Sequence, residues 1–169
     1  MTKYTSFLLI AFVFAFSGCS IKYSFSGASI PPEAQTVSVA NFPNMAPLVN
    51  PTLSNTLTEA LKDRFLSQTN LQLISSYGDL QFEGSIVGYK TAPVNIQANS
   101  DAAAQNRLTI AVKVKFTNLL DPEANYETKF SRYAEYDSSQ SLADVESGLV
   151  EQIVEELIED IFNKAVVNW

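Results

Sequence analysis

The chain has 169 residues, with 18 acidic against 11 basic side chains and a formal net charge of −7. This charge argues against general nucleic-acid binding, which depends on Lys and Arg neutralising phosphates. The absence of histidine removes the commonest general base and the commonest metal ligand. No glycine-rich phosphate loop or catalytic carboxylate signature is present. We therefore expect a protein without enzymatic activity, cofactor, metal or nucleic-acid partner.

The N-terminal segment has the pattern of a lipoprotein signal. Lys3 precedes an apolar run from Phe7 to Phe16, which is about half the length that crosses a membrane. The run ends in Ser17-Gly18-Cys19, and Cys19 is the only cysteine in the chain. These residues resemble a bacterial lipobox, although leucine is commoner than Phe16 at its position. The resemblance implies cleavage before Cys19 and its acylation; the alternative is an ordinary signal peptide with an incidental cysteine.

This pattern divides the chain into three parts. Residues 1–18 are expected to be the signal peptide, residues 19–35 a lipidated tether, and residues 36–169 a single domain. Serines, glycine and the Pro31-Pro32 pair favour an extended tether, and the alternative is that it adds an edge strand. The remaining chain is long enough to bury its own core without disulfides.

The first half of the domain is predicted to contain two short strands around a helix. Residues 36–40 alternate and are β-branched, which indicates a strand, whereas residues 41–49 hold two prolines and should be irregular. Asn50-Pro51 is typical of a helix start, and the predicted helix runs to about Gln68. Its apolar stripe consists of Leu53, Leu57, Leu61 and Phe65. Residues 71–74 form the second short strand.

The second half is predicted to contain three longer strands and a helix. In the strand over residues 80–90, Gly84 and Gly88 suggest a bulge or a closely packed helix. Residues 91–106 form a long polar loop, a candidate functional or mobile segment. Residues 107–118 alternate clearly, a turn follows at 121–123, and residues 126–136 return as the partner strand. A long helix is expected from residue 142 to about 166, with an acidic solvated face.

These elements predict an α+β fold in the order β-α-β-β-β-β-α. A mixed four- to five-stranded sheet with two helices packed on one face would bury both apolar stripes. The other sheet face would then stay open to solvent. We expect it to carry Gln81, Glu83, Ser85, Tyr89, Thr109, Lys113, Lys115, Lys129, Ser131 and Tyr133.

Basic residues gather on the predicted strands, while the acidic residues gather on the last helix. If the two long strands pair through the turn at Asp121, then Lys113, Lys115 and Lys129 share the open face. Strict alternation places Arg132 on the apolar face, unless a bulge redirects it or it lies beyond the cover of the helices. These four residues are candidate ligands for an anionic group such as a phosphate. The alternative is that the lysines only prevent edge-to-edge pairing.

Three segments of the sequence resemble the LptE family of lipopolysaccharide-assembly lipoproteins. They are residues 84–94 (GSIVGYKTAPV), 106–118 (NRLTIAVKVKFTN) and 130–136 (FSRYAEY), together with the lipobox and the order of elements. The resemblance implies an outer-membrane lipoprotein that faces the periplasm, with an acyl anchor. It also implies association with the β-barrel protein LptD and binding of lipopolysaccharide through basic residues. Ser20 after the cysteine fits sorting to the outer membrane.

Two other binding functions remain open at this point. A lipobox, a tether and a compact α/β domain would equally suit a periplasmic lipoprotein that activates a cell-wall synthase. They would also suit an accessory lipoprotein of an ABC transporter. The partner that co-purifies with the protein distinguishes these possibilities.

Overall fold

The computed structural model describes residues 30–48, 50–94 and 104–166. Within them it contains five strands, two long helices and one short 3-10 helix. Their bounds are β1 (Thr36–Val39), α2 (Leu53–Gln68), β2 (Gln72–Ile74), β3 (Leu80–Val94), β4 (Gln105–Asn118), η1 (Pro122–Ala124), β5 (Tyr126–Asp137) and α3 (Leu142–Val166). The predicted order and the α+β class are confirmed.

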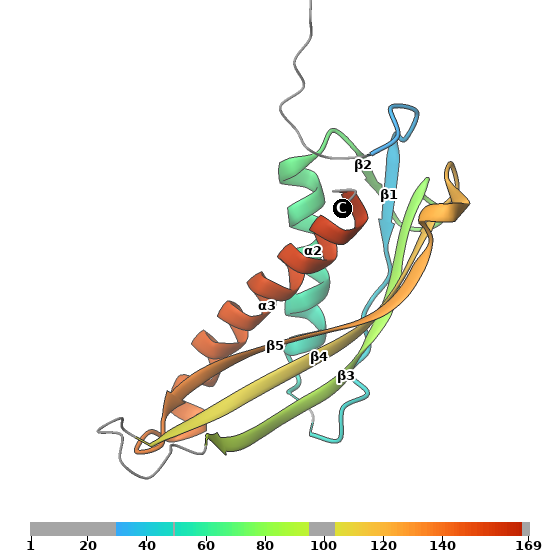
Figure 1. The fold of residues 1–169 in the computed structure, drawn as a ribbon. Helices are drawn as coiled ribbons and strands as arrows, with labels where there is room; N and C mark the ends of the chain where they lie inside the picture. The colour runs from blue at the N-terminus through green and yellow to red at the C-terminus, as the bar shows by residue number, and fades with distance from the viewer. Residues whose placement is uncertain (1–29, 49, 95–103, 167–169) are drawn as a thin grey trace, which may run out of the picture.

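The strands form one mixed sheet in the order β2-β1-β3-β4-β5. Strand β1 pairs in parallel with β2 and β3, and β3, β4 and β5 form an antiparallel meander. The sheet is curved, and both helices lie on its concave side (Figure 1). The opposite, convex face has no helix over it, so the prediction of one covered and one open face is confirmed.

Helix α2 begins at Leu53, two residues after the predicted start at Pro51, and Thr52 is its N-cap. The Asn50 Oδ1 atom accepts hydrogen bonds from the backbone N–H groups of Thr52 (3.0 Å) and Leu53 (3.1 Å), which satisfies donors that the first turn leaves free. The predicted stripe of the helix is fully buried against the sheet. At its end, the ring of Phe65 packs between Phe82 of β3 and Phe162 of α3, with centroid separations of 4.8 and 5.1 Å. These aromatic contacts join both layers.

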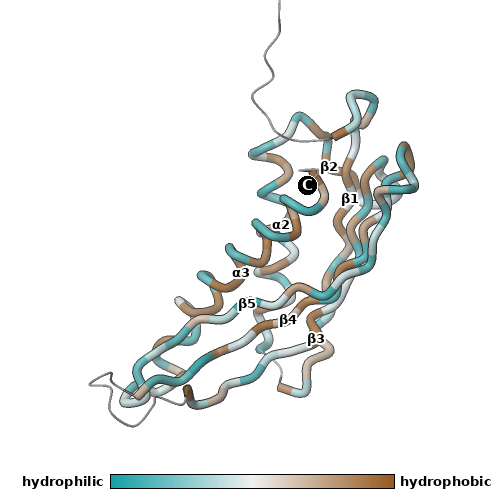
Figure 2. Tube along the Cα trace, viewed as in Figure 1, coloured by the Kyte–Doolittle hydropathy of each residue, from teal (hydrophilic) through white to brown (hydrophobic). Residues whose placement is uncertain are grey.

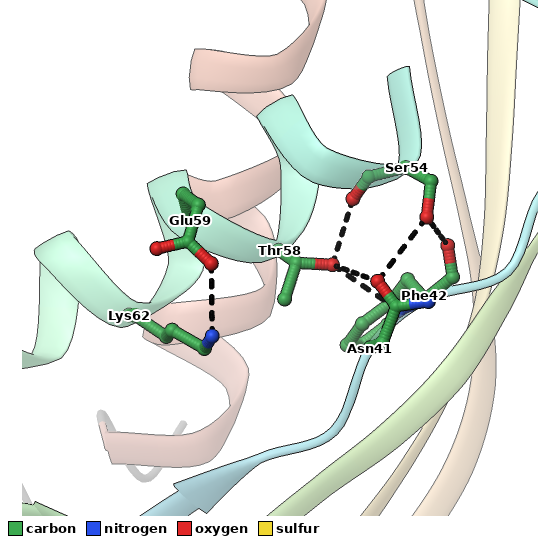
Figure 3. A network of polar contacts seen from close by, with 6 residues as sticks. All are labelled: Asn41, Phe42, Ser54, Thr58, Glu59 and Lys62. Atoms are coloured by element: carbon green, nitrogen blue, oxygen red, sulfur yellow. Dashed lines mark hydrogen bonds and ion pairs between the residues drawn. The ribbon is translucent and has the colours of Figure 1, made fainter. Parts of the chain in front are cut away.

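The segment that follows β1 is held to α2 by a polar network (Figure 3). The Ser54 hydroxyl donates to the carbonyl of Phe42 (2.6 Å), and the Thr58 hydroxyl accepts from the Phe42 N–H (3.1 Å). Thr58 also donates to the Ser54 carbonyl (2.7 Å). Phe42 is fully buried, so these bonds satisfy backbone groups that have no strand partner there. The irregular stretch expected over residues 41–49 is therefore anchored at its start.

A bulge in β3 changes which side chains face the helices. Between Ile86 and Gly88 the register with β4 shifts by one residue, so Val87 is the extra residue. The shift turns Tyr89 to the buried face, opposite Ile110, where only 6% of it is exposed. The prediction that Tyr89 lies on the open face was therefore wrong, because it assumed unbroken alternation. Lys90 takes the open face instead, opposite Thr109.

The strands β3 and β4 are longer than predicted. Residues 91–94 and 105–106, which were expected to be loop, pair with each other in register, including Pro93 opposite Asn106. Strand β1 ends beside Phe82, so β3 has β4 as its only neighbouring strand at Pro93. A proline on such an edge costs no ladder hydrogen bond, because the side of β3 away from β4 has no strand partner. Residues 95–103 of the expected loop lie outside the described residues.

The domain also begins earlier than the sequence indicates. Ile30 and Ala34, which were assigned to the tether, pack against the buried core. The Ala34 N–H donates to the Pro31 carbonyl (2.9 Å) and closes a turn just before β1. The remainder of the expected tether, the signal peptide and Cys19 lie outside the described residues.

Candidate functional site

The open face of the sheet is ordered in rows of side chains that cross three strands. The register between β3, β4 and β5 aligns Glu83, Lys115 and Glu127 in one row. The next row contains Ser85, Lys113 and Lys129. The three lysines predicted to share this face therefore do so. Two of them, Lys113 and Lys129, stand directly opposite each other on neighbouring strands.

Carboxylates neutralise part of this lysine group. Lys113 forms an ion pair with Glu127, and the Lys115 Nζ atom lies 3.2 Å from Glu83 Oε2. The contact with Lys113 holds the pKa of Glu127 below its ordinary value. No carboxylate among the described residues lies within ion-pair distance of Lys129. Lys129 therefore carries the uncompensated charge of the group.

Glu127 is a residue of the lysine group that the predicted list of open-face residues lacks. The signal was available, because the hairpin that places Lys129 opposite Lys113 also places Glu127 opposite Lys115. We name Lys113, Lys115 and Lys129, together with their partners Glu83 and Glu127, the lysine patch. More than half of the Lys113 and Lys115 side-chain surface is exposed, so both are accessible to a ligand.

Farther along the same face is a second polar group. The Arg107 guanidinium lies over the ring of Tyr133, 3.9 Å from its centroid, and its Nε donates to Glu135 (3.0 Å). Tyr133 is half exposed. Four residues separate it from Lys129 on β5, which corresponds to about 13 Å along a strand. An aromatic ring and basic side chains thus extend the polar surface beyond the lysine patch.

Arg132 does not join the three lysines. It pairs in register with the buried Ile110, without any bulge, and so faces the helix layer. There its Nε and Nη2 donate to the two carboxylate oxygens of Asp160 in α3, at 2.6 and 2.5 Å. This carboxylate raises the pKa of the guanidinium. Strict alternation predicted this face for Arg132, and the register confirms it; the acidic partner on α3 lets a charged residue occupy the helix-facing side.

Tyr89 takes part in a contact that the sequence did not predict. Its hydroxyl donates to Glu146 of α3, whose Oε1 also accepts from the Asn50 side chain (3.0 Å). Burial, and then the neighbouring carboxylate, raise the pKa of Tyr89. The three residues tie β3 to the first turns of α3 and to the start of α2. This role is structural, because Glu146 bridges elements that pack together.

The helix layer has the opposite charge. A shallow groove of about 440 Å³ between α2 and α3 is lined by Glu59, Asp63, Glu151 and Glu155, with Arg64 as its basic residue. An anionic ligand would be repelled from this side. In the stretches that the structure describes, no three His, Cys, Asp or Glu residues gather as metal ligands. None of the helices described is long and apolar enough to span a bilayer.

The fold and this charged face define a class: a small α+β domain with an open, charged sheet face. The family described as LptE, lipopolysaccharide-assembly, matches residues 34–165. The chain therefore belongs to the LptE family, which confirms the resemblance read from the sequence. Its members are non-enzymatic lipoproteins associated with the outer membrane. No curated protein matches the chain.

Solved structures share the fold at low sequence identity. A hypothetical protein from Chlamydia trachomatis is 10% identical with a TM-score of 0.55, over 80% of this chain and 99% of that one. A minor lipoprotein from Acinetobacter baumannii is 14% identical with a TM-score of 0.50, over 78% and 91% of the two chains. A protein from Xanthomonas campestris is 10% identical with a TM-score of 0.50, over 81% and 91%. At these identities the likeness shows the fold alone.

Proposed function

We propose that this lipopolysaccharide-assembly lipoprotein binds lipopolysaccharide through the lysine patch and associates with an LptD-like β-barrel. The proposal places it at the outer membrane, on the periplasmic side, held by acyl chains on Cys19. Its role is to bind and to assist transport, without turnover. Family membership supports a role in lipopolysaccharide assembly, and the open sheet face supplies a surface for the ligand.

The observation that carries ligand binding is the pairing of Lys113 with Lys129. Like charges directly opposite each other on neighbouring strands repel and destabilise a sheet. Glu127 compensates Lys113, and Lys129 remains without a carboxylate partner among the described residues. A phosphate bound between the two ammonium groups would relieve this repulsion through charge-assisted hydrogen bonds. Lipopolysaccharide is an anionic ligand that offers such groups.

The partner is tested by affinity purification from solubilised outer membranes, followed by identification of what co-purifies. We expect an LptD-like β-barrel. A cell-wall synthase or an ABC transporter in its place would overturn the assignment in favour of one of those functions. Replacing Cys19 by Ala should release the protein from membranes when no barrel is present, because each buried acyl methylene contributes about 0.8 kcal/mol to anchoring.

Ligand binding is tested by reversing the charge of the patch. We expect the triple variant Lys113→Glu, Lys115→Glu, Lys129→Glu to weaken lipopolysaccharide binding by about tenfold or more, equal to about 1.4 kcal/mol. Binding is measured by titration with purified lipopolysaccharide, and circular dichroism checks the fold.

Matched controls separate this effect from a change in total charge. The variant Lys62→Glu, Arg64→Glu, Lys164→Glu changes the net charge equally but lies on the helices, and should bind almost as tightly as the parent. Arg132→Gln should also retain binding, because its side chain is engaged by Asp160. Equal losses in the sheet and helix triples would remove the lysine patch from the proposal.

A further inference from the structure

At one end of the sheet, two turns lie beside the N-terminal start of the domain. Leu80 at the start of β3 pairs with Asn118 at the end of β4, so the turns before β3 and after β4 lie together. The Leu119 N–H donates to the Asp79 carbonyl (2.9 Å), which joins these two turns directly. We call this region, which comprises residues 30–36, 75–79 and 119–125, the entry end (upper part of Figure 1).

The entry of the chain is pinned to the same place by Asp79. Its Oδ2 accepts from the backbone N–H groups of Gln35 and Thr36, both at 2.9 Å, and from the Thr36 hydroxyl (2.8 Å). These bonds, led by the one from Gln35, lower the pKa of the Asp79 carboxyl. The path from the anchor therefore reaches the domain beside the two turns. Ile30 is only eleven positions after Cys19, which limits their distance to about 40 Å.

The entry end exposes large apolar side chains. Leu119 is 55% exposed, Leu120 is 44% exposed, and Tyr77 is 85% exposed. Figure 2 shows hydrophobic residues in the turn between β4 and β5. The structure fixes these residues instead of burying them. The Asn118 Oδ1 atom accepts from the N–H groups of Leu120 (2.9 Å) and Asp121 (3.0 Å), and Tyr77 holds a left-handed backbone, with φ of 57°.

We propose that the entry end rests on the phospholipid surface that holds the acyl anchor, with Leu119, Leu120 and Tyr77 in the headgroup region. The inference rests on the proposed acylation of Cys19 and goes beyond the binding of lipopolysaccharide or a barrel. A short connection brings this end to the bilayer, and exposed leucines gain free energy by leaving water. A tyrosine ring is favoured at a membrane interface, where its hydroxyl stays hydrated.

The same turn sets how deep this contact reaches. Asp121 and Glu123 follow the two leucines and are exposed, so they stay in the aqueous layer. The contact is therefore shallow, and it favours zwitterionic over strongly anionic lipid. The far end of β3 and β4, where Val94 pairs with Gln105, lies at the other end of these strands from the entry end. In the proposed orientation it points away from the bilayer surface. The lysine patch begins three residues from Leu80 on β3 and from Asn118 on β4, so it lies on the open face in the half of the sheet nearer the entry end.

The test uses single thiols introduced into the full acylated chain. Because acylation blocks Cys19, a cysteine placed by Leu120→Cys is the only site for an environment-sensitive fluorophore. The labelled protein is reconstituted in vesicles of phosphatidylethanolamine and phosphatidylglycerol, without lipopolysaccharide or a barrel. We expect blue-shifted emission and quenching by phospholipids that carry a headgroup nitroxide. Labelling of the unsubstituted chain would show a free Cys19 and would overturn the proposal.

Met45→Cys is the matched control, because Met45 is 70% exposed but lies beside Ile86. That is six residues along β3 from Leu80, about 20 Å from the entry end. A label there should keep its aqueous emission. Adding Leu119→Ser and Leu120→Ser to a label at Tyr77→Cys should abolish the quenching at residue 77. Equal quenching at residues 120 and 45, or none at either, would overturn the proposal, and neither result depends on lipopolysaccharide binding.

Discussion

Gly84 lies in β3 under the ring of Phe42. A Cβ atom at this position would lie 2.2 Å from the Lys113 carbonyl oxygen and 2.5 Å from Cε1 of Phe42. The missing side chain therefore lets the segment after β1 cross close to the sheet. The sequence singled out this glycine for close packing, and the partner is an aromatic ring from a connecting segment.

We predict that Gly84→Ala destabilises the protein by about 1–3 kcal/mol, because the added methyl group overpacks the core. The free energy of unfolding is measured by urea denaturation. Gly148→Ala is the matched control, since nothing lies within 4 Å of a Cβ atom there. It should stabilise α3 by roughly 0.5–1 kcal/mol, because alanine favours a helix more than glycine does. An unchanged midpoint for Gly84→Ala would contradict the close packing under Phe42.

At the scale of elements, α2 is fixed by more than its apolar stripe. The stripe holds it against the sheet, but Ser54 and Thr58 determine how the chain after β1 approaches it. Thr58 is 3% exposed, and its hydroxyl both accepts from Phe42 and donates to Ser54. Leaving a buried N–H group without an acceptor costs more free energy than an exposed hydrogen bond contributes.

We predict that Thr58→Val lowers the free energy of unfolding by about 1–3 kcal/mol, because the Phe42 N–H is left unsatisfied. Chemical denaturation measures this, and amide hydrogen exchange at Phe42 should become faster. Thr56→Val is the control, since the Thr56 hydroxyl only donates to the Thr52 carbonyl on the exposed side of the helix. Equal effects of the two substitutions would show that the network does not hold this segment.

Helix α3 shows how charge is divided between elements. Its buried side packs on the sheet, while its carboxylates face solvent or engage residues of the strands. Arg132 and Tyr89 each reach α3 from the sheet, through Asp160 and Glu146. The Arg132–Asp160 ion pair is exposed, so it contributes little free energy, about 0–1 kcal/mol. The hydrogen bond from Tyr89 to Glu146 is part-buried and is not an ion pair.

At the scale of the whole molecule, the two faces differ in charge. Helix α3 carries seven acidic residues against one lysine, Lys164, and the open sheet face carries the lysine patch. An anionic ligand is therefore steered to the sheet face. The entry end adds a third surface, with exposed apolar side chains beside carboxylates, close to the expected anchor. The proposed lipid contact, the proposed ligand face and the acidic side of α3 thus occupy different parts of a small domain.

Much of the fold could be predicted because its signals are local. The stripe of α2 and the alternation of residues 107–118 are read from neighbouring residues, and the structure has both. Asn50 lies just before α2, as predicted, but the N-cap is Thr52. The hairpin that joins β4 and β5 also follows from its turn, so the shared face of Lys113 and Lys129 was predictable. The extension of β3 and β4 into the expected loop could not be predicted, because pairing with β4 continues the strand past Pro93.

The sequence by itself determined the order of elements, the apolar stripes, the basic strands and the single cysteine, because each depends on composition or on a short period. Only the tertiary structure decided which side chains meet. One extra residue at Val87 moved Tyr89 to the other face, since strand alternation after a bulge depends on register. The contact with Asp160 holds the Arg132 side chain against α3. The hydrogen bond that Asp79 accepts from Gln35 holds the start of the domain beside the exposed leucines. These contacts join residues far apart in the sequence, which no local pattern records.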